Sequence, residues 1–282
     1  MADDAAKPGG RVRVGTWNVQ FAKLSLEKGP FVAKVLAAPD CDILCVTEVG
    51  AADILPKCGN MIDAGTDWGY SIPKASPGRR KVLLWSKRPW TPVFDPLQAR
   101  LPGGRLVAGV TETPIGKITV VGVCIPWRDA HVNSGRRDRV AWQDHLNWLA
   151  GFARTSFASG GLRTIVLGDF NQRIPRKYTP SGVHDELERT LERFEVATEG
   201  DFLEIPAPLI EVDHSNVWMG ALREPPGKKG GALIDHIAHT GDLTLHQPQP
   251  KADGVRCVGI YPKALGATKL SDHSGVWGDF KV

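Results

Sequence analysis

The sequence lacks any apolar run that approaches the roughly 18 consecutive residues of a membrane-spanning helix. Its first ten residues also lack the apolar segment of a secretory signal peptide. We therefore expect no membrane anchor, and we predict that residues 1–10 form a disordered N-terminal tail. Cysteine is scarce, with 5 in 282 residues, and Cys41, Cys45 and Cys124 lie in or beside apolar stretches where buried thiols are usual. A zinc site from Cys41 and Cys45 would need a second pair of ligands, which Cys58 alone does not supply. Free, buried thiols fit a reducing, cytoplasmic compartment best.

The sequence also lacks an internal repeat, a low-complexity tract and any segment long enough to link two domains. Its clusters of proline and glycine, such as Leu101-Pro102-Gly103-Gly104, are short. Hydrophobic residues make up 42% of the chain, which is ample for a packed core. We therefore predict that residues 11–282 form a single domain, and we also expect a monomer.

Short apolar stretches separated by turn residues predict many β-strands with a few helices between them. The strands are expected at Arg11–Trp17, Ile43–Thr47, Lys81–Ser86, Leu106–Thr113, Lys117–Ile125, Arg163–Leu167, Asn216–Met219, Leu233–Ala238 and Gly275–Phe280. The helices are expected at Phe31–Leu36, Arg136–Ala153 and His184–Val196. The second helix has the clearest pattern, because Trp142, Leu146 and Leu149 recur at helical spacing. This order of elements predicts one α/β domain with two packed sheets and helices outside them.

Polar residues stand at the ends of several of these apolar stretches. The five motifs are Thr16-Trp17-Asn18, Val46-Thr47-Glu48, Gly168-Asp169-Phe170-Asn171, Ile234-Asp235-His236 and Leu270-Ser271-Asp272-His273. Together they offer carboxylates, amides and imidazole, which are the groups that hold a hard divalent cation and a phosphate. Taken singly, Glu48 could be a surface residue, Asp169 a turn residue and Asn18 a strand cap. Their joint occurrence favours a functional site over these structural explanations.

In this order, the five motifs resemble those of the endonuclease/exonuclease/phosphatase superfamily of metal-dependent phosphoesterases. The resemblance extends from Trp17 to about Trp277, which is nearly the whole chain. It implies a four-layered α/β sandwich, in which two mostly antiparallel sheets are packed together and flanked by helices. It also implies an active site at one edge of the two sheets.

The resemblance implies that Asn18, Glu48 and Asp272 approach a divalent cation, with Glu48 as the principal ligand. Carboxylate oxygens suit Mg²⁺, which keeps several waters and binds few protein ligands. We therefore expect Mg²⁺ or Mn²⁺ as the cofactor. Such a cation stabilises the negative charge that develops on oxygen atoms during phosphodiester hydrolysis.

For the reaction itself, the resemblance assigns roles to four residues. Asp169 orients or deprotonates the attacking water, and Asn171 hydrogen-bonds the phosphate. His273 faces the scissile phosphate, and Asp235 is its carboxylate partner. General chemistry agrees, because a buried Asp can hold a neighbouring His charged and oriented. For His236, a place near the site and a place in the core both stay open.

One position departs from the family pattern. Many members carry a Tyr or His that touches the phosphate after the strand expected at Lys117–Ile125, whereas this position reads as Cys124 here. A thiol is a weak hydrogen-bond donor. Arg128 could replace that contact with its guanidinium group.

Basic residues lie beside these motifs and indicate a polyanionic substrate. Arg173, Arg176 and Lys177 follow the Gly-Asp-Phe-Asn motif, and Arg79-Arg80-Lys81 forms a second cluster. Such clusters can follow a nucleic-acid backbone, and Trp127 could stack on an unpaired base. Both features also have a structural explanation. The basic clusters could form a solvated charged face, and Trp127 could pack under its own loop. The net charge of +4 permits a polyanionic partner without requiring one.

We therefore expect a Mg²⁺-dependent nuclease that acts on DNA or RNA. A phosphatase or phosphodiesterase of a small-molecule or lipid phosphate, built on the same catalytic residues, is the main alternative. A third class, a non-catalytic binding module that kept the fold, is disfavoured because every polar motif is intact.

Overall fold

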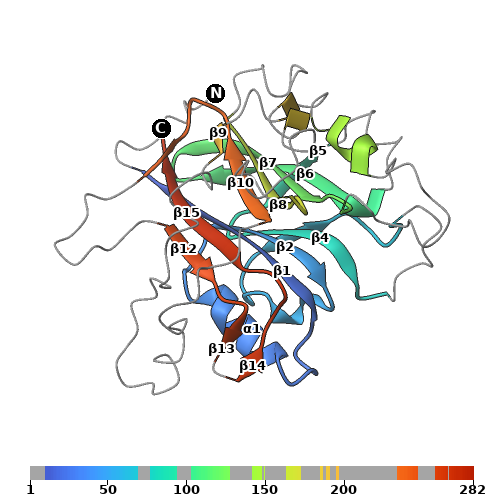
Figure 1. Ribbon diagram of the computed structural model, residues 1–282. Helices are drawn as coiled ribbons and strands as arrows, with labels where there is room; N and C mark the ends of the chain where they lie inside the picture. Colours follow the sequence, from blue (N-terminus) through green and yellow to red (C-terminus); the bar gives the residue numbers. More distant parts are fainter. Residues whose placement is uncertain are drawn as a thin grey trace, which may run out of the picture.

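The protein is represented by a computed structural model, which describes residues 10–68, 77–93, 103–127, 142–147, 149, 163–172, 185–186, 189–190, 195–196, 234–246, 258–265 and 267–282. In this part of the chain, two β-sheets pack face to face, and helix α1 (Gly29–Ala37) covers the outer face of the first sheet (Figure 1). No helix in these ranges is long and apolar enough to cross a membrane. The predicted tail lies outside them, apart from Gly10.

The first sheet has the strand order β11–β15–β1–β2–β4–β3, and β12 also pairs with β15. Its strands are β1 (Val12–Ala22), β2 (Ile43–Val49), β3 (Asn60–Asp63), β4 (Arg80–Ser86), β11 (Thr244–Leu245), β12 (Val258–Tyr261) and β15 (Gly275–Lys281). β1 runs parallel to β2 and antiparallel to β15. The first and last strands of the described chain are therefore neighbours, as Figure 1 shows.

The second sheet has the strand order β5–β6–β7–β8–β10–β9. Its strands are β5 (Trp90–Val93), β6 (Leu106–Thr113), β7 (Gly116–Cys124), β8 (Arg163–Asp169), β9 (Glu195–Val196) and β10 (Asp235–His239). β7 and β8 run parallel, so each sheet is mixed although antiparallel pairs dominate. Shorter elements are the 3₁₀ helices η1 (Ala52–Ile54) and η3 (Gly103–Arg105) and the hairpin of β13 (Ala264–Leu265) and β14 (Thr268–Lys269).

Strand β2 shows how both faces of the first sheet are buried. Ile43 and Cys45 point into the core between the two sheets, whereas Leu44 and Val46 point into the core beneath α1. Successive side chains of a strand point to opposite faces, so a continuous apolar run fills two cores at once. This explains why β2 reads as uninterrupted apolar sequence rather than as an alternating pattern.

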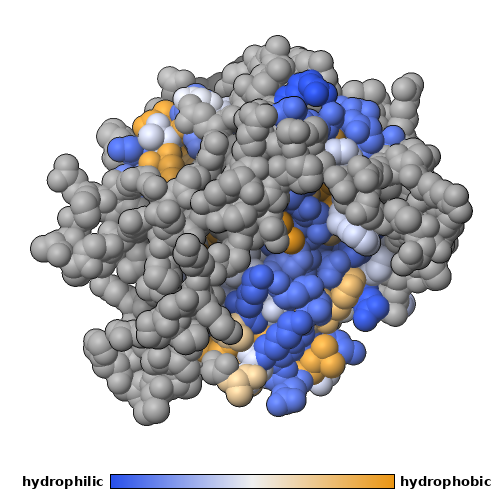
Figure 2. Space-filling view, in the orientation of Figure 1, coloured by the Kyte–Doolittle hydropathy of each residue, from blue (hydrophilic) through white to orange (hydrophobic). Residues whose placement is uncertain are grey.

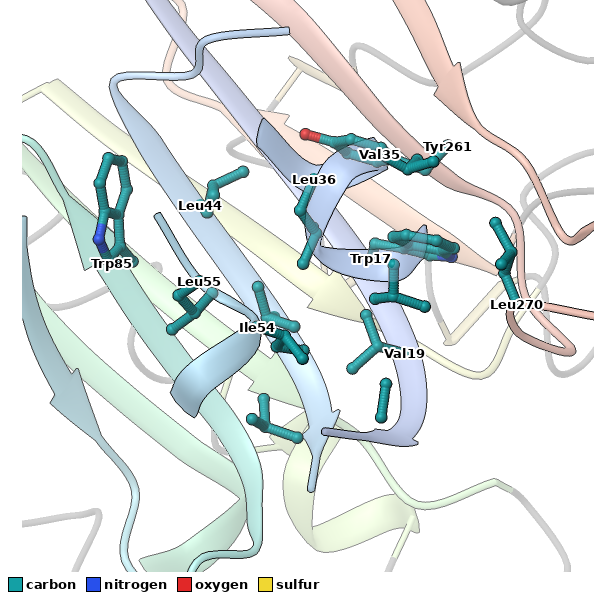
Figure 3. Packing of buried hydrophobic residues seen from close by; sticks show 14 of the residues in the cluster. Trp17, Val19, Val35, Leu36, Leu44, Ile54, Leu55, Trp85, Tyr261 and Leu270 are labelled. Atoms are coloured by element: carbon teal, nitrogen blue, oxygen red, sulfur yellow. The ribbon is translucent and has the colours of Figure 1, made fainter. Parts of the chain in front are cut away.

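The outer core is built on an aromatic pair. Trp17 of β1 stacks on Tyr261 of β12, with ring centroids 5.4 Å apart and planes inclined by 7°. Val35 and Leu36 of α1 pack over this pair, as Figure 3 shows. Proline at the start of α1 suits the first turn of a helix, where backbone N–H groups have no intrahelical acceptor. The packing fixes β1, which carries the first polar motif.

Most of the predicted strands are confirmed, and several run further than predicted. β8 continues past Leu167 to Asp169, so Asp169 lies within a strand. β1 continues past Trp17 to Ala22, and β2 continues past Thr47 to Val49, so Asn18 and Glu48 lie within strands. The end of the predicted helix at His184–Val196 is wrong, because Glu195 and Val196 form β9 and pair with β10. Cross-strand pairing there overrides the helical pattern of the local sequence.

Other predictions concern the outer layers. Residues 142–147 and 149 are helical, inside the helix predicted at Arg136–Ala153, and residues 185–186 and 189–190 are helical as well. The strand predicted at Asn216–Met219 lies outside the described residues. The structure thus shows two mixed sheets and the helix over the first one, while the four-layered sandwich stays a prediction.

The described surface is mainly hydrophilic over the lower part of the face seen in Figure 2, with a few hydrophobic residues among them. Large exposed hydrophobic side chains are spread over separate elements; examples are Phe31 on α1, Met61 on β3 and Trp127 after β7. Single exposed hydrophobic residues are normal on a protein surface. Trp127 stands apart because it also lines a pocket, where its side chain remains 56% exposed.

Candidate active site

A pocket with a volume of about 440 Å³ lies where strand ends from both sheets meet. It is lined by Asn18, Phe21, Glu48, Trp68, Lys81, Arg105, Cys124, Pro126, Trp127, Asp169, Asn171, Asp272 and His273. Four of the five predicted motifs therefore contribute directly to a single pocket. The fifth motif contributes Asp235, which is fully buried and reaches the pocket through its hydrogen bond with His273.

The second sheet aligns three of these side chains by register. Cys124 of β7 pairs with Asp169 of β8, and Asp169 pairs with Asp235 of β10. Gly168, which precedes Asp169, makes the close pairing of β8 with β7 possible, because a Cβ atom at position 168 would lie 2.0 Å from the carbonyl oxygen of Val123. Its φ of +144° is also rare for residues with a side chain.

The first sheet presents its residues through an irregularity in strand pairing. The register between β1 and β2 shifts between Asn18 and Ala22, and Gln20 and Phe21 within this stretch have positive φ. Glu48, on the facing part of β2, also has a positive φ of 51°. Bulges of this kind redirect side chains, and non-glycine residues with positive φ are frequent at functional sites. Here the bulge lies between two predicted metal ligands.

Asp169 is held at the centre of the pocket by its neighbours. Its Oδ2 accepts a hydrogen bond from Asn18 Nδ2 at 2.9 Å, and its Oδ1 accepts one from the backbone N–H of Asn171 at 2.9 Å. Burial and the nearby charge of Asp235 raise the pKa of Asp169 to about 7, although His273 and Asn18 oppose the shift. A carboxylate with a pKa near neutral is suited to accept a proton from water.

His273, which is partly exposed, forms an ion pair with the fully buried Asp235. His273 Nδ1 lies 2.8 Å from Asp235 Oδ2, and it lies 4.0 Å from Asp169 Oδ1. Burial alone would lower the pKa of His273, but the hydrogen bond and charge of Asp235, with smaller contributions from Asp169 and Asp272, raise it to about 9. The ring is therefore a cation at neutral pH, which can stabilise negative charge on phosphate oxygens.

The loop before β15, which carries His273, is tied to β1. Ser271 Oγ donates to the Asn18 carbonyl at 2.6 Å and accepts from the His273 backbone N–H at 3.1 Å. Trp17 Nε1 donates to the His273 carbonyl at 3.1 Å. Lys28 Nζ, which the sequence did not single out, donates to the carbonyls of Val19, Gln20 and Leu270 at 3.0–3.1 Å. These bonds fix His273 relative to Asn18.

Asn171 and Cys124 both line the pocket. Asn171 lines the pocket in a left-handed conformation, with φ of 53°, and its Nδ2 donates to the Ile125 carbonyl at 2.7 Å. Its amide has a second N–H, so this bond leaves one donor for a phosphate. Cys124 Sγ lies 4.0 Å from Asp169 Oδ2, and burial raises the pKa of this thiol. A neutral thiol at this position supplies no strong donor.

Two sets of side chains could hold a cation. Glu48 and Asp272 both line the pocket, and both carboxylates are partly accessible. Asp169, Asp235 and His273 form the second set, with ligand atoms within 4.8 Å of one another. A protonated imidazole cannot ligate a metal, so His273 would first have to lose its proton. The carboxylates of the first set fit Mg²⁺ or Mn²⁺ without that step.

Asn18 is less available to a cation than the sequence suggested. Its Nδ2 donates to Asp169, and its Oδ1 accepts from the backbone N–H of Gln20 at 2.9 Å. Its clearest contact is therefore with Asp169, whose orientation it fixes. The assignment of Asn18 as a metal ligand stays a prediction.

Five pocket residues were not among the predicted site residues: Phe21, Trp68, Lys81, Arg105 and Pro126. Arg105 is buried and donates to the carbonyls of Trp68 and Cys124 at 3.3 and 3.4 Å. Phe21 and Trp68 stack with centroids 5.6 Å apart. None of these residues stands in a recognisable motif, and only the basic run Arg79-Arg80-Lys81 hinted at one of them.

The remaining predictions divide into two groups. Arg128, Arg173, Arg176 and Lys177 lie outside the described residues. His236 lies in the core: it is buried, its Nε2 contacts the Gln172 carbonyl at 2.7 Å, and burial lowers its pKa to about 4. A neutral, buried ring on β10 has a structural place rather than a catalytic one.

Comparison with known proteins agrees with this geometry. A sequence profile described as "Endonuclease/Exonuclease/phosphatase family" matches residues 15–273. The chain belongs to this family. It is therefore a metal-dependent phosphoesterase, with a buried candidate site formed by Asp169, Asp235 and His273. No curated protein matches the sequence.

Solved structures of this family share the fold. The 3′-5′ exonuclease NExo from Neisseria meningitidis is 19% identical, with a TM-score of 0.60 over 96% of this chain and 100% of that chain. Truncated TDP2 from Caenorhabditis elegans is 16% identical, with a TM-score of 0.58 over 98% and 100%. The human nocturnin catalytic domain is 17% identical, with a TM-score of 0.56 over 96% and 93%. At these identities the similarity shows the fold alone.

Proposed function

We propose that this phosphoesterase is a nuclease that hydrolyses phosphodiester bonds of DNA or RNA with Mg²⁺ or Mn²⁺. The observation that carries the proposal is the joint position of Asp169, His273 and the exposed Trp127 in one pocket. Asp169 can accept a proton from water, the charged ring of His273 can bind phosphate, and Trp127 offers a stacking surface for a nucleobase. Similar structures include a 3′ phosphatase NExo bound to a product DNA hairpin, which supports a nucleic-acid substrate.

The roles of the residues follow from their surroundings. Glu48 and Asp272 would hold the cation, whose charge stabilises the phosphate oxygens during attack. Asp169, with its pKa near 7, takes the proton of the attacking water. His273 carries a proton because of Asp235 and faces the phosphate as a positive charge. The amide of Asn171 supplies a neutral donor to a phosphate oxygen.

The substrate reaches these groups past Trp127. Its ring is the most exposed aromatic surface of the pocket, and base stacking on such a ring is sequence-tolerant. Arg128, Arg173, Arg176 and Lys177 belong to the same proposal as contacts to the nucleic-acid backbone. We further propose that the protein acts as a cytoplasmic monomer, a point that size-exclusion chromatography and cell fractionation test.

The test compares substrates and variants. With Mn²⁺ present, we expect cleavage of single-stranded DNA or RNA to exceed hydrolysis of bis-p-nitrophenyl phosphate and inositol phosphates in kcat/KM. Trp127→Ala should lower kcat/KM on the single strand by roughly 5- to 150-fold, since stacking contributes about 1–3 kcal/mol per base. The same variant should hydrolyse the small ester normally.

Met61→Ala is the matched control, because Met61 is 50% exposed but lies away from the pocket. It should leave both activities unchanged. Preference for an inositol or lipid phosphate, with no effect of Trp127→Ala on any nucleic acid, would instead establish the small-phosphate alternative.

A further inference from the structure

Lys81 contacts the predicted principal metal ligand. The ammonium group of Lys81, on β4, forms an ion pair and hydrogen bond with Oε1 of Glu48 on the neighbouring strand β2. Both residues line the pocket that contains Asp169 and His273. The Lys81 side chain is only 13% exposed, so this is a partly desolvated pair rather than a surface one.

Two aromatic rings keep Lys81 in this place. Its Nζ lies 5.2 Å from the ring centroid of Phe21 and 5.2 Å from that of Trp68. Cations within about 6 Å of a ring face are attracted to it. Lys81 therefore stays in the pocket even when its carboxylate partner is taken by another cation. Phe21 is placed for this contact by the bulge in β1.

An ion pair at Glu48 has a direct consequence for metal binding. A divalent cation can use Oε1 only if the ammonium group moves away from it, and the two cations then repel each other inside one pocket. A phosphate group bound beside them removes much of this repulsion. Its oxygens can accept hydrogen bonds from the released ammonium group, which has three donors.

We propose that Lys81 couples metal binding to phosphate binding by competing with the divalent cation for Glu48. In the absence of phosphate, Lys81 neutralises Glu48 and the cation binds weakly. When phosphate is present, Lys81 turns to it and the cation binds more tightly. Because such coupling is reciprocal, the metal also raises the affinity for phosphate. The inference rests on the proposed metal-dependent hydrolysis, and it assigns Lys81 as a phosphate-binding residue that also sets the affinity of Glu48 for the metal.

The experiment measures Mn²⁺ binding by electron paramagnetic resonance, at micromolar Mn²⁺, with and without inorganic phosphate. Lys81→Met should bind Mn²⁺ at least about fivefold more tightly than the unmodified protein when phosphate is absent. Added phosphate should increase the affinity for Mn²⁺ in the unmodified protein. The increase should be smaller in Lys81→Met. Lys81→Arg, which keeps the charge, should retain weak binding of the metal.

Lys87→Met is the matched control. Lys87 follows β4, and its ammonium group pairs with Asp40 and Asp42 at 3.1 Å, away from the pocket. This variant loses the same charge, so unchanged Mn²⁺ affinity excludes an effect of net charge. Thermal melting of each variant checks that it is folded. If Lys81→Met is not folded, Lys81→Gln is used in its place.

Two failures are distinguishable. Suppose that folded Lys81→Met and Lys81→Gln bind Mn²⁺ with the affinity of the unmodified protein, and that the unmodified protein hydrolyses bis-p-nitrophenyl phosphate with Mn²⁺. The competition is then disproved, and the proposed function stands. If the unmodified protein neither binds Mn²⁺ nor hydrolyses any phosphodiester with it, both the function and the coupling are disproved.

Discussion

His273 Nδ1 lies 2.8 Å from Oδ2 of Asp235, a carboxylate with no exposure to solvent, although 38 residues separate the two in sequence. The pair places a protonated imidazole beside Asp169, the other buried carboxylate of the site. The charge of Asp235 raises the pKa of both Asp169 and His273. The proposed chemistry of the site therefore depends on three residues from separate motifs acting together.

The first prediction concerns this dependence. Asp235→Asn and His273→Ala should each lower kcat by roughly 100-fold or more, in the range of a positioned proton-transfer group. Because Asp235 acts through His273, the double variant should be little slower than His273→Ala alone. Steady-state kinetics on one phosphodiester substrate measure this. Multiplication of the two losses, in folded protein, would show that the residues act independently.

The second prediction concerns pH. Asp169 acts as the deprotonated form, so activity should rise as the pH passes its pKa of about 7. His273 acts as the protonated form, so activity should fall as the pH passes its pKa of about 9. Asp235→Asn removes a negative charge that raises both pKa values, so both limbs of the kcat/KM profile should move to lower pH.

Asp242→Asn is the control for this profile. Asp242 is partly exposed, pairs with Arg163 at 3.9 Å and does not line the pocket. It removes the same charge and should leave both limbs in place. A profile of Asp235→Asn that coincides with that of the unmodified protein would contradict the assignment of Asp169 and His273.

The third prediction concerns the cation. EDTA should abolish hydrolysis, and added Mg²⁺ or Mn²⁺ should restore it. Glu48→Gln should raise the metal concentration for half-maximal activity by about tenfold or more, because an amide is a weaker ligand than a carboxylate. Glu112→Gln, which alters a half-exposed glutamate paired with Lys117 at 3.3 Å, should not change it. Full activity in EDTA would exclude metal assistance.

The fourth prediction concerns the backbone beneath Asp169. Gly168→Ala should reduce the free energy of unfolding by about 3 kcal/mol or more, because its Cβ would meet the Val123 carbonyl and its φ is unfavourable. Gly65→Ala is the matched control: Gly65 also has a positive φ, of 76°, but no atom lies within 4 Å of an added Cβ. It should cost only about 1 kcal/mol. Chemical denaturation measures both, and equal losses would show that the contact with Val123 is unimportant.

Local sequence was sufficient to locate most of the longer strands of both sheets. Apolar runs such as Leu106–Thr113 are long enough to be read without any partner, and the structure has β6 over the same residues. The short strands β3, β5, β11, β12, β13 and β14 were missed, since two to four residues give no measurable pattern. Glu195–Val196 was taken for helix because only its pairing with β10 makes it a strand.

The sequence by itself identified most of the polar side chains that meet at the pocket, because five polar motifs interrupt apolar strands at places where folding would otherwise favour hydrophobic residues. Only the tertiary structure decided how they meet. Asn18 and Asp169 are 151 residues apart yet hydrogen-bonded, and Lys81 reaches Glu48 from the neighbouring strand. Strand register, a bulge in β1 and the packing of two sheets set these contacts. None of these three features can be predicted from a local pattern of residues.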